Sequence, residues 1–188
     1  RLVRVKLNLE MAATDEMVTI ACKTGPHTSM LVPEGRQEVT TEGGLDVAGQ
    51  RERMRDVVKQ LKDGGMIVSA FIDPSPEQVE ACAEVGFDVC EVHTGPYASA
   101  FARCGGDMRH AELIEQLKLV QEAGQIIANA GMRFNAGHAL NYHNVQPIAA
   151  LAGIDELHIG HSIVCRSVFV GLRQAVAEMK SLMTAASS

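Results

Sequence analysis

Short apolar runs alternate with longer helix-like segments along the whole chain, and this order constrains the fold more than any other feature. Strands are expected at residues 5–9, 29–32, 67–72, 88–93, 133–136 and 156–159. Helices are expected after them, at residues 14–24, 47–62, 73–85, 107–130, 145–151 and 162–184. A Gly-rich loop is expected between His93 and Asp107. Such regular alternation predicts a parallel sheet covered by helices.

The alternation alone is compatible with two architectures, an open doubly wound sheet and a (β/α)8 barrel. No change in composition and no Pro/Ser-rich linker divides the chain, so residues 1–188 are expected to form a single domain. Six strand–helix units are two short of a barrel. The chain begins with Arg1 directly before a strand-like run, and we therefore expect a segment of a longer protein whose start would supply the other units.

Composition excludes several classes of partner. The 17 Lys and Arg residues against 23 Asp and Glu residues give a formal net charge of −6, which argues against a nucleic-acid-binding protein. No run of apolar residues is long enough for a membrane span, so no membrane partner is expected. The five cysteines are scattered and form no CxxC pair, which favours reduced, structural thiols and a cytoplasmic location.

Ionisable residues recur where the expected strands end, which is where parallel α/β folds place their ligands. Glu10 follows the first strand, Glu91 and His93 close the fourth, and the last two strands are followed by histidines, His138 and His161. Charged groups gathered at one edge of a sheet cost stability unless they are used, so we expect a site there. For Glu10 alone, a surface acid leading into the next helix is an equally ordinary interpretation.

Two further sequence patterns indicate what the residues of this expected site could do. Glu91 and His93 are two residues apart on a strand and share one face, where a carboxylate beside an imidazole would form a proton-handling pair or a structural ion pair. Gly137-His138 and Gly160-His161 are two similar turns that could cradle phosphate at a helix start, with Ser162 as a helix cap, although glycine is also common in plain turns. Motifs for a P-loop, a dinucleotide fold, a zincin or a serine nucleophile elbow do not occur.

Several stretches, in order along the chain, carry a resemblance to a known family. They are Asn8–Ala12, Leu31–Glu34, Arg36–Val47, Phe71–Asp73, Glu91–Gly95, Asn135–His138, Tyr142–Asn144 and Ile159–His161. The most specific is the run Thr-Thr-Glu-Gly-Gly-Leu-Asp-Val, which ends at Val47. With these motifs the chain resembles the pyridoxine 5′-phosphate synthases over essentially its whole length.

The resemblance implies a (β/α)8 TIM barrel, of which this chain would supply strands 3–8 with their helices and lack the first two βα units. It implies condensation of 1-deoxy-D-xylulose 5-phosphate with 3-amino-2-oxopropyl phosphate to pyridoxine 5′-phosphate, phosphate and water. The family uses no metal or organic cofactor, works in the cytoplasm and forms octamers built from dimers. An N-terminally shortened chain would lack part of the substrate-contacting set, so we expect it to be inactive by itself.

Matching positions imply residue roles. Glu10 corresponds to the general base, His138 to the proton donor, and Glu91 to the group that stabilises the transition state. Substrate contacts are implied for Thr40, Ala139, Gly160 and His161. No residue is implied as a metal ligand.

The chain departs from the family pattern in three places. Ala139 replaces a glycine. Alanine disfavours a positive φ, so this departure bears on whether the turn can bind phosphate as in the family. Gly35 replaces a lysine beside the site loop, and the segment Pro96–Arg109 is longer than usual. Two alternatives therefore stay open: another cofactor-free phosphosugar isomerase or epimerase on the same fold, and a non-catalytic, truncated homologue.

Overall fold

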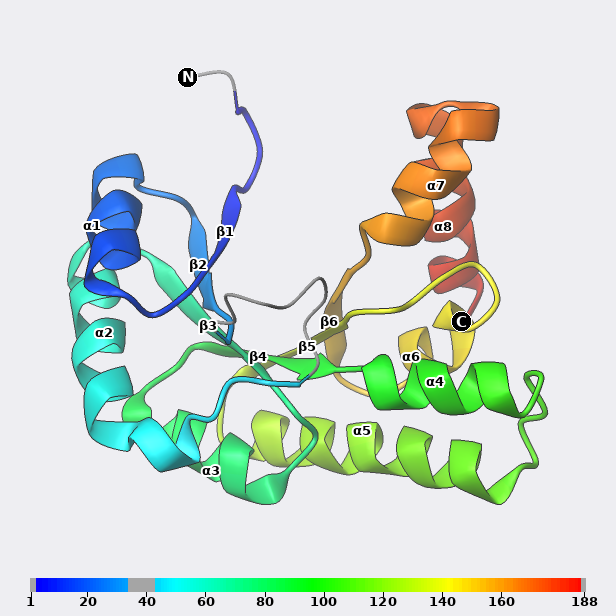
Figure 1. The fold of residues 1–188 in the computed structure, drawn as a ribbon, viewed down its shortest axis with the longest axis horizontal. Coiled ribbons are helices and arrows are strands. Elements are labelled where there is room, and N and C mark those ends of the chain that lie inside the picture. The colour runs from blue at the N-terminus through cyan, green and yellow to red at the C-terminus, as the bar shows by residue number, and fades with distance from the viewer. Residues whose placement is uncertain (1–2, 34–42, 187–188) are drawn as a thin grey trace.

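Six parallel strands form one sheet whose spatial order follows the sequence. The computed structural model describes residues 3–33 and 43–186. The strands are β1 (Asn8–Met11), β2 (Thr28–Leu31), β3 (Ile67–Ile72), β4 (Val89–His93), β5 (Arg133–Gly137) and β6 (Ile154–His158). The sheet is curled, and helices run along its outer side (Figure 1). This curled half-barrel is consistent with part of a TIM barrel and differs from an open sheet with helices on both faces.

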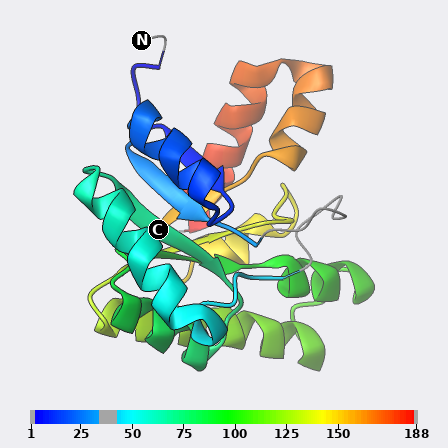
Figure 2. The ribbon, with the colours of Figure 1, turned by 60° about the vertical axis from the view of Figure 1, so that its left-hand side comes forward.

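The helices connect successive strands, as the alternation predicts. They are α1 (Asp15–Thr24), the short 3-10 turn η1 (Ala48–Gln50), α2 (Arg51–Asp63), α3 (Pro76–Val85), α4 (Gly95–Arg103), α5 (Ala111–Asn129), α6 (Val145–Ala149), α7 (His161–Val170) and α8 (Leu172–Ala186). Among them, α2, α3 and α5 pack directly against strands of the sheet. Figure 2 shows α1 and the α7–α8 pair at opposite ends of the curled sheet.

Local sequence signals account for where several helices begin and end. The Thr14 hydroxyl accepts a hydrogen bond from the Met17 amide, which caps the start of α1. Gly25 ends this helix with φ of 60°, a left-handed conformation that a residue without Cβ adopts at little cost. These boundaries confirm the helix predicted at residues 14–24.

The core is built almost entirely from aliphatic side chains, because the chain has few aromatic residues. All five residues of β4 are buried, as expected for a strand in the middle of a curled parallel sheet. On the outer side, Val68 and Ile72 of β3 belong to the same buried cluster as Leu61 of α2 and Val79 of α3. Each such side chain contributes roughly 1.5–3 kcal/mol when it is fully removed from water.

The first strand starts later than predicted. The alternating pattern at residues 5–9 predicted a strand there, whereas β1 begins at Asn8 and continues through Glu10 to Met11. Val5 is 82% exposed, since β2 itself begins only at Thr28 and offers residues 5 and 6 no partner within the described chain. The shift places Glu10 inside the strand instead of after it.

The segment predicted as a Gly-rich loop contains a helix, α4. Its glycines sit only at the ends, and its interior carries the helix-forming alanines Ala98, Ala100 and Ala102. Tyr97 is buried, and its hydroxyl donates a hydrogen bond to the Asn144 carbonyl, which ties α4 to the loop after β5. The extension Pro96–Arg109 is therefore mostly this helix and the turn that leads to α5.

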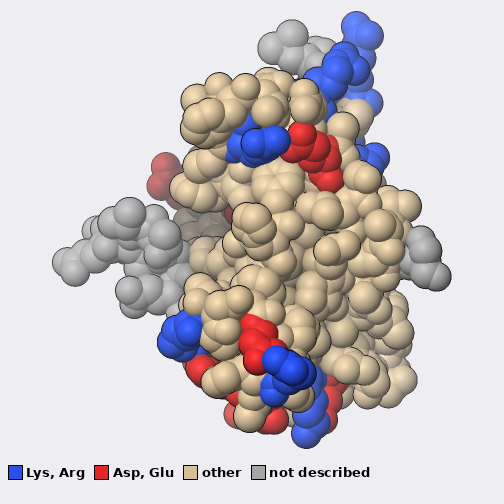
Figure 3. Space-filling model, turned by 90° about the vertical axis from the view of Figure 1, so that its right-hand side faces the viewer, with Lys and Arg blue, Asp and Glu red and all other residues tan. Residues whose placement is uncertain are grey.

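The long helix predicted at residues 162–184 is two helices. Gly171 adopts φ of 83° between α7 and α8, which breaks the helical path, and the two helices pack against each other. Much of the face on this side of the molecule is free of charged residues (Figure 3), and Val168 and Phe169 are 79% and 84% exposed. Within residues 3–33 and 43–186, no helix combines the length and the apolarity that crossing a membrane requires.

Candidate active site

The ends of β1, β4, β5 and β6 surround one cavity of ≈ 680 Å³. Six of the candidate residues line it: Glu10, Glu91, His138, Ala139, Gly160 and His161. Thr40, the seventh candidate, lies outside the described residues, as does the departure at Gly35. The curled parallel sheet explains this gathering, because it points the carboxyl ends of all its strands toward the same side. Residues from the first and the last strand–helix unit thereby share one cavity.

Glu91 is a buried carboxylate whose partner is His158. The side chain of Glu91 is 3% exposed, and its Oε2 forms an ion pair with Nδ1 of His158 on β6. Its other oxygen, Oε1, lies against Gly137, where a Cβ would overlap both this oxygen and the His158 carbonyl. Gly137 is thus required by the close approach of the Glu91 carboxylate.

His158 was not among the residues predicted for the site. Glu156 and His158 are two residues apart near the end of a strand, the same spacing as Glu91 and His93. That repeated Glu-x-His pattern was the signal available in the sequence. This spacing could have predicted that His158 lies on the inner face of its strand. It could not have predicted the contact of His158 with Glu91.

His93 faces inward with Glu91, as predicted, but the two side chains do not pair. The His93 ring is 4% exposed, and its Nδ1 lies 2.9 Å from Oδ1 of Asp73 at the end of β3. The hydrogen bond with His93 is the main reason that the pKa of Asp73 lies below its usual range. The predicted Glu91–His93 proton-handling pair is therefore replaced by two separate carboxylate–imidazole pairs, with partners that come from the end of β3 and from β6, two strands away.

Glu10 is the carboxyl group that remains open to the cavity. Partial burial raises its pKa, the charge of Glu91 raises it further, and the charge of His158 lowers it. A carboxyl group with a raised pKa is a stronger base than an ordinary glutamate, and with access to a cavity it can exchange a proton with a bound molecule. This is the property that a general base requires.

His138 lines the same cavity as Glu10 and Glu91. Its ring packs against His93 with centroids 5.0 Å apart and against Phe71 with centroids 6.2 Å apart. Burial lowers the pKa of His138, and the neighbouring His93 lowers it further. A lowered pKa makes the protonated ring a stronger acid, which suits a proton donor.

The turn after β5 holds two non-glycine residues in the left-handed region, His138 with φ of 79° and Ala139 with φ of 59°. Surrounding hydrogen bonds fix this conformation. The Thr94 hydroxyl lies 2.6 Å from the carbonyl oxygens of both Gly137 and His138, and the Asn144 amide donates to the Ala139 carbonyl at 3.2 Å. The site therefore keeps a strained turn, which the neighbouring side chains stabilise.

Replacing Ala139 with glycine is expected to raise the free energy of unfolding by about 0.5–1 kcal/mol, because glycine adopts this φ without a Cβ penalty. Urea denaturation measures the change. Gly153→Ala is the matched control: Gly153 has φ of 82°, and a Cβ at this position would meet no atom within 4 Å, so this variant should lose a similar amount. A loss of stability in Ala139→Gly would show that the turn is not strained.

The turn after β6 leads directly into α7, with Gly160 as the residue before the helix. The first amides of a helix have no acceptor within the helix and attract anions, and His161 adds an imidazole at the same place. Ser162 does not cap the helix as expected. Its hydroxyl donates a hydrogen bond to the Leu140 carbonyl at 2.9 Å, which joins the two turns that border the cavity.

No three His, Cys, Asp or Glu side chains within the described ranges are placed to hold a metal ion together. The described residues at this cavity supply groups that can transfer protons and bind anions.

The sequence matches the family model described as pyridoxal phosphate biosynthesis protein PdxJ over residues 1–185. The chain belongs to this family. It is 61% identical over 180 residues to the pyridoxine 5′-phosphate synthase of Dechloromonas aromatica, covering 96% of this chain and 72% of that protein. It is 50% identical over 181 residues to the protein of the same name from Rhodopirellula baltica, covering 96% of this chain and 70% of that protein.

Two solved structures of other proteins resemble this chain in fold only. A BexX/CysO complex from Amycolatopsis orientalis matches with a TM-score of 0.59 at 19% identity, over 90% of this chain and 59% of that chain. A GMP reductase from Trypanosoma brucei matches with a TM-score of 0.60 at 17% identity, over 96% of this chain and 42% of that chain. Both likenesses concern the curled parallel sheet and its helices.

Proposed function

We propose that the protein condenses 1-deoxy-D-xylulose 5-phosphate with 3-amino-2-oxopropyl phosphate to give pyridoxine 5′-phosphate, phosphate and water. The observation that carries this proposal is the single cavity shared by Glu10, Glu91 and His138 in a member of the PdxJ family. The condensation forms an imine, closes the ring and eliminates phosphate and water, and each of these steps needs a proton to be added or removed. A positioned carboxylate base and a histidine donor can perform such proton transfers.

The surroundings of the three residues support distinct roles. Glu10 is open to the cavity and acts as the general base. His138 lines the same cavity and acts as the proton donor. Glu91 has one oxygen on His158 and the other against Gly137, so it stabilises developing positive charge as a fixed carboxylate.

The phosphate group of 3-amino-2-oxopropyl phosphate is proposed to lie between the two Gly-His turns. Ala139 borders the cavity from one turn, and Gly160 and His161 border it from the other. The start of α7 supplies backbone amides and the positive end of the helix dipole. Thr40 is proposed to contact the deoxyxylulose phosphate, and the scheme uses no metal or organic cofactor.

A substrate panel tests the proposed reaction against its alternatives. The full-length protein is incubated with 1-deoxy-D-xylulose 5-phosphate and the amino ketone phosphate, and separately with ribulose 5-phosphate. Consumption of the first pair without epimerisation of ribulose 5-phosphate is expected. Epimerisation alone would favour a phosphosugar epimerase, and inertness toward every substrate would favour a non-catalytic homologue.

We also propose a finer description of the fold, in which the six strands are equivalent to strands 3–8 of an eight-stranded barrel. Its support is the curl of the sheet and the fact that β1 and β6 each pair with one strand among the described residues. A structure of the full-length protein tests it. Two further parallel strands between β6 and β1 are expected, whereas direct pairing of β6 with β1 would contradict the proposal.

Self-association and location are proposals of the same kind. The family resemblance supports a cytoplasmic homo-octamer built from dimers. Light scattering of the full-length protein measures its mass, and a monomer at micromolar concentration would contradict the octamer.

A further inference from the structure

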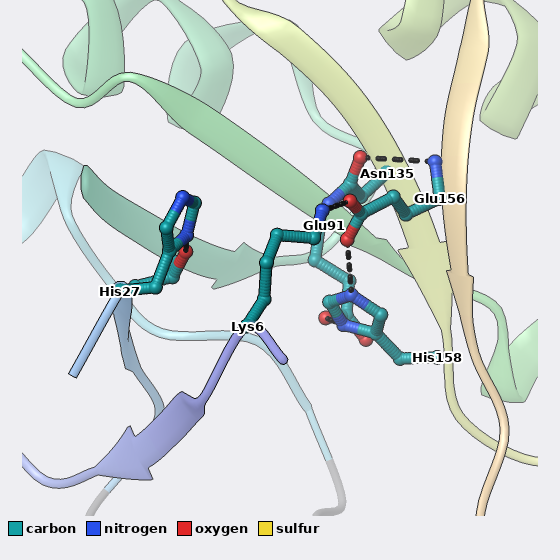
Figure 4. Close-up of polar contacts among 7 residues, drawn as sticks. Lys6, His27, Glu91, Asn135, Glu156 and His158 are labelled. Carbon is teal, nitrogen blue, oxygen red and sulfur yellow. Dashed lines mark hydrogen bonds and ion pairs between the residues drawn. The ribbon is translucent and has the colours of Figure 1, made fainter. Parts of the chain in front are cut away.

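His158 lies between the catalytic cavity and the opposite end of the barrel, and it lines a cavity on each side. Its two ring nitrogens have different carboxylate partners: Nδ1 pairs with Glu91, and Nε2 lies 3.5 Å from Oε2 of Glu156. Figure 4 shows the ring between these side chains, with Lys6 approaching Glu156. We propose that His158 is a positioning residue that, as a cation, fixes the side chain of Glu91 in place and leaves Glu10 as the group that exchanges protons.

The contacts favour a ring with protons on both nitrogens. A neutral imidazole carries one N–H and one lone pair, so one of its nitrogens would turn a lone pair toward a carboxylate oxygen. The imidazolium can donate a hydrogen bond to Glu91 and at the same time present an N–H to Glu156, whose Oε2 lies at ion-pair distance, 3.5 Å from Nε2. Burial by itself lowers the pKa of His158, but the hydrogen bonds and charges of Glu91 and Glu156 outweigh it and hold the pKa above its usual value.

The charge of His158 explains why the two nearby carboxyl groups, Glu10 and Glu91, can have different roles. Glu10 and Glu91 face the same cavity, and the charge of Glu91 raises the pKa of Glu10. His158 forms an ion pair with Glu91, and its charge lowers the pKa of Glu10. Glu10 has no ion-pair partner among the described residues, and its pKa stays raised.

Other charged groups face His158 from every neighbouring element. Glu10 comes from β1, Glu91 from β4 and Glu156 from β6 itself. Lys6 forms an ion pair with Glu156, and Arg133 at the start of β5 borders the smaller cavity of ≈ 40 Å³ below the ring. The three carboxylates exceed the two cations around the ring, so the net surroundings favour the charged imidazolium.

The catalytic test rests on the proposed function and compares pH profiles. His158→Gln keeps an N–H donor but removes the charge, and kcat/KM is measured from pH 5 to pH 9 in the full-length protein. The acidic limb, set by Glu10, should move up by about one pH unit, since loss of a neighbouring cation raises the pKa of a carboxyl group. His158→Lys restores a cation and should return the limb toward that of the unchanged protein.

A purely structural role would lower kcat/KM by the same factor at every pH. A His158→Gln profile that superimposes on the original after scaling would therefore overturn the proposal. His110→Gln is the matched control, because His110 is an exposed histidine at the start of α5 and should leave the profile in place.

A second measurement needs no catalysis and so separates this proposal from the proposed reaction. NMR of the histidine-labelled protein gives the pKa of the His158 ring directly. The expected value is above 6.5, and Glu91→Gln should lower it by about one unit or more. A His158 pKa at or below 6.5 in the unchanged protein would overturn the proposal even if the protein makes pyridoxine 5′-phosphate.

Discussion

Replacing Glu10 with glutamine in the full-length protein is expected to lower kcat for pyridoxine 5′-phosphate formation by about 10²–10⁴, the usual size of the loss of a general base. Glutamine has nearly the same shape as glutamate and keeps the contacts of β1, but it cannot accept a proton. Glu10 reaches the cavity from a strand that is held in register with β2, so the fold should survive the change. Steady-state kinetics with saturating substrates measure the effect.

The pH dependence of kcat/KM should differ between Glu10→Gln and the unchanged protein. Burial and the charge of Glu91 raise the pKa of Glu10, so the base form appears only as the pH rises through a value above the usual glutamate range. The unchanged protein should therefore gain kcat/KM over that interval, and Glu10→Gln should lack this gain. Glu16→Gln, an exposed acid in the first turn of α1, is the control. Unchanged turnover in Glu10→Gln would remove Glu10 from the mechanism.

Replacing His138 with glutamine is expected to lower kcat by a similar factor of about 10²–10⁴, because the cavity would lose its proton donor. Glutamine can still form hydrogen bonds, so substrate binding and KM should change less than kcat. The variant keeps a residue with a Cβ at φ of 79°, and the strain of the turn is therefore retained.

The pH profile separates this loss from a general disturbance of the turn. Burial and His93 lower the pKa of His138, so the protonated donor disappears as the pH rises through a value below the usual histidine range. That descending limb of kcat/KM should be absent in His138→Gln and retained in the control His110→Gln. A variant that keeps both the turnover and the descending limb would assign the donor role to another group.

The strands and the helices that cover them could be predicted from local patterns. Strand β3 is a short apolar run, and helix α1 carries a capping threonine and a terminal glycine at its ends. Glu10, Glu91 and His138 could be proposed because parallel strands present their carboxyl ends on one side. These inferences need no knowledge of which side chains touch.

Features that depend on distant contacts could not be predicted in the same way. Helix α4 was missed because Gly95 and the pair Gly105-Gly106 dominate the local pattern, while its stability comes from the burial of Tyr97. The ion pair of Glu91 with His158 joins residues 67 positions apart, and their approach depends on the missing Cβ of Gly137. Contacts between segments distant in the sequence decided both outcomes, and a local sequence pattern does not carry that information.

We propose that this cavity joins two phosphorylated substrates into pyridoxine 5′-phosphate. Mass spectrometry of the product made by the full-length protein tests it most directly, with each substrate omitted in turn. Pyridoxine 5′-phosphate is expected only when 1-deoxy-D-xylulose 5-phosphate and 3-amino-2-oxopropyl phosphate are both present. A folded full-length protein that consumes neither substrate and forms no pyridoxine 5′-phosphate would contradict the claim.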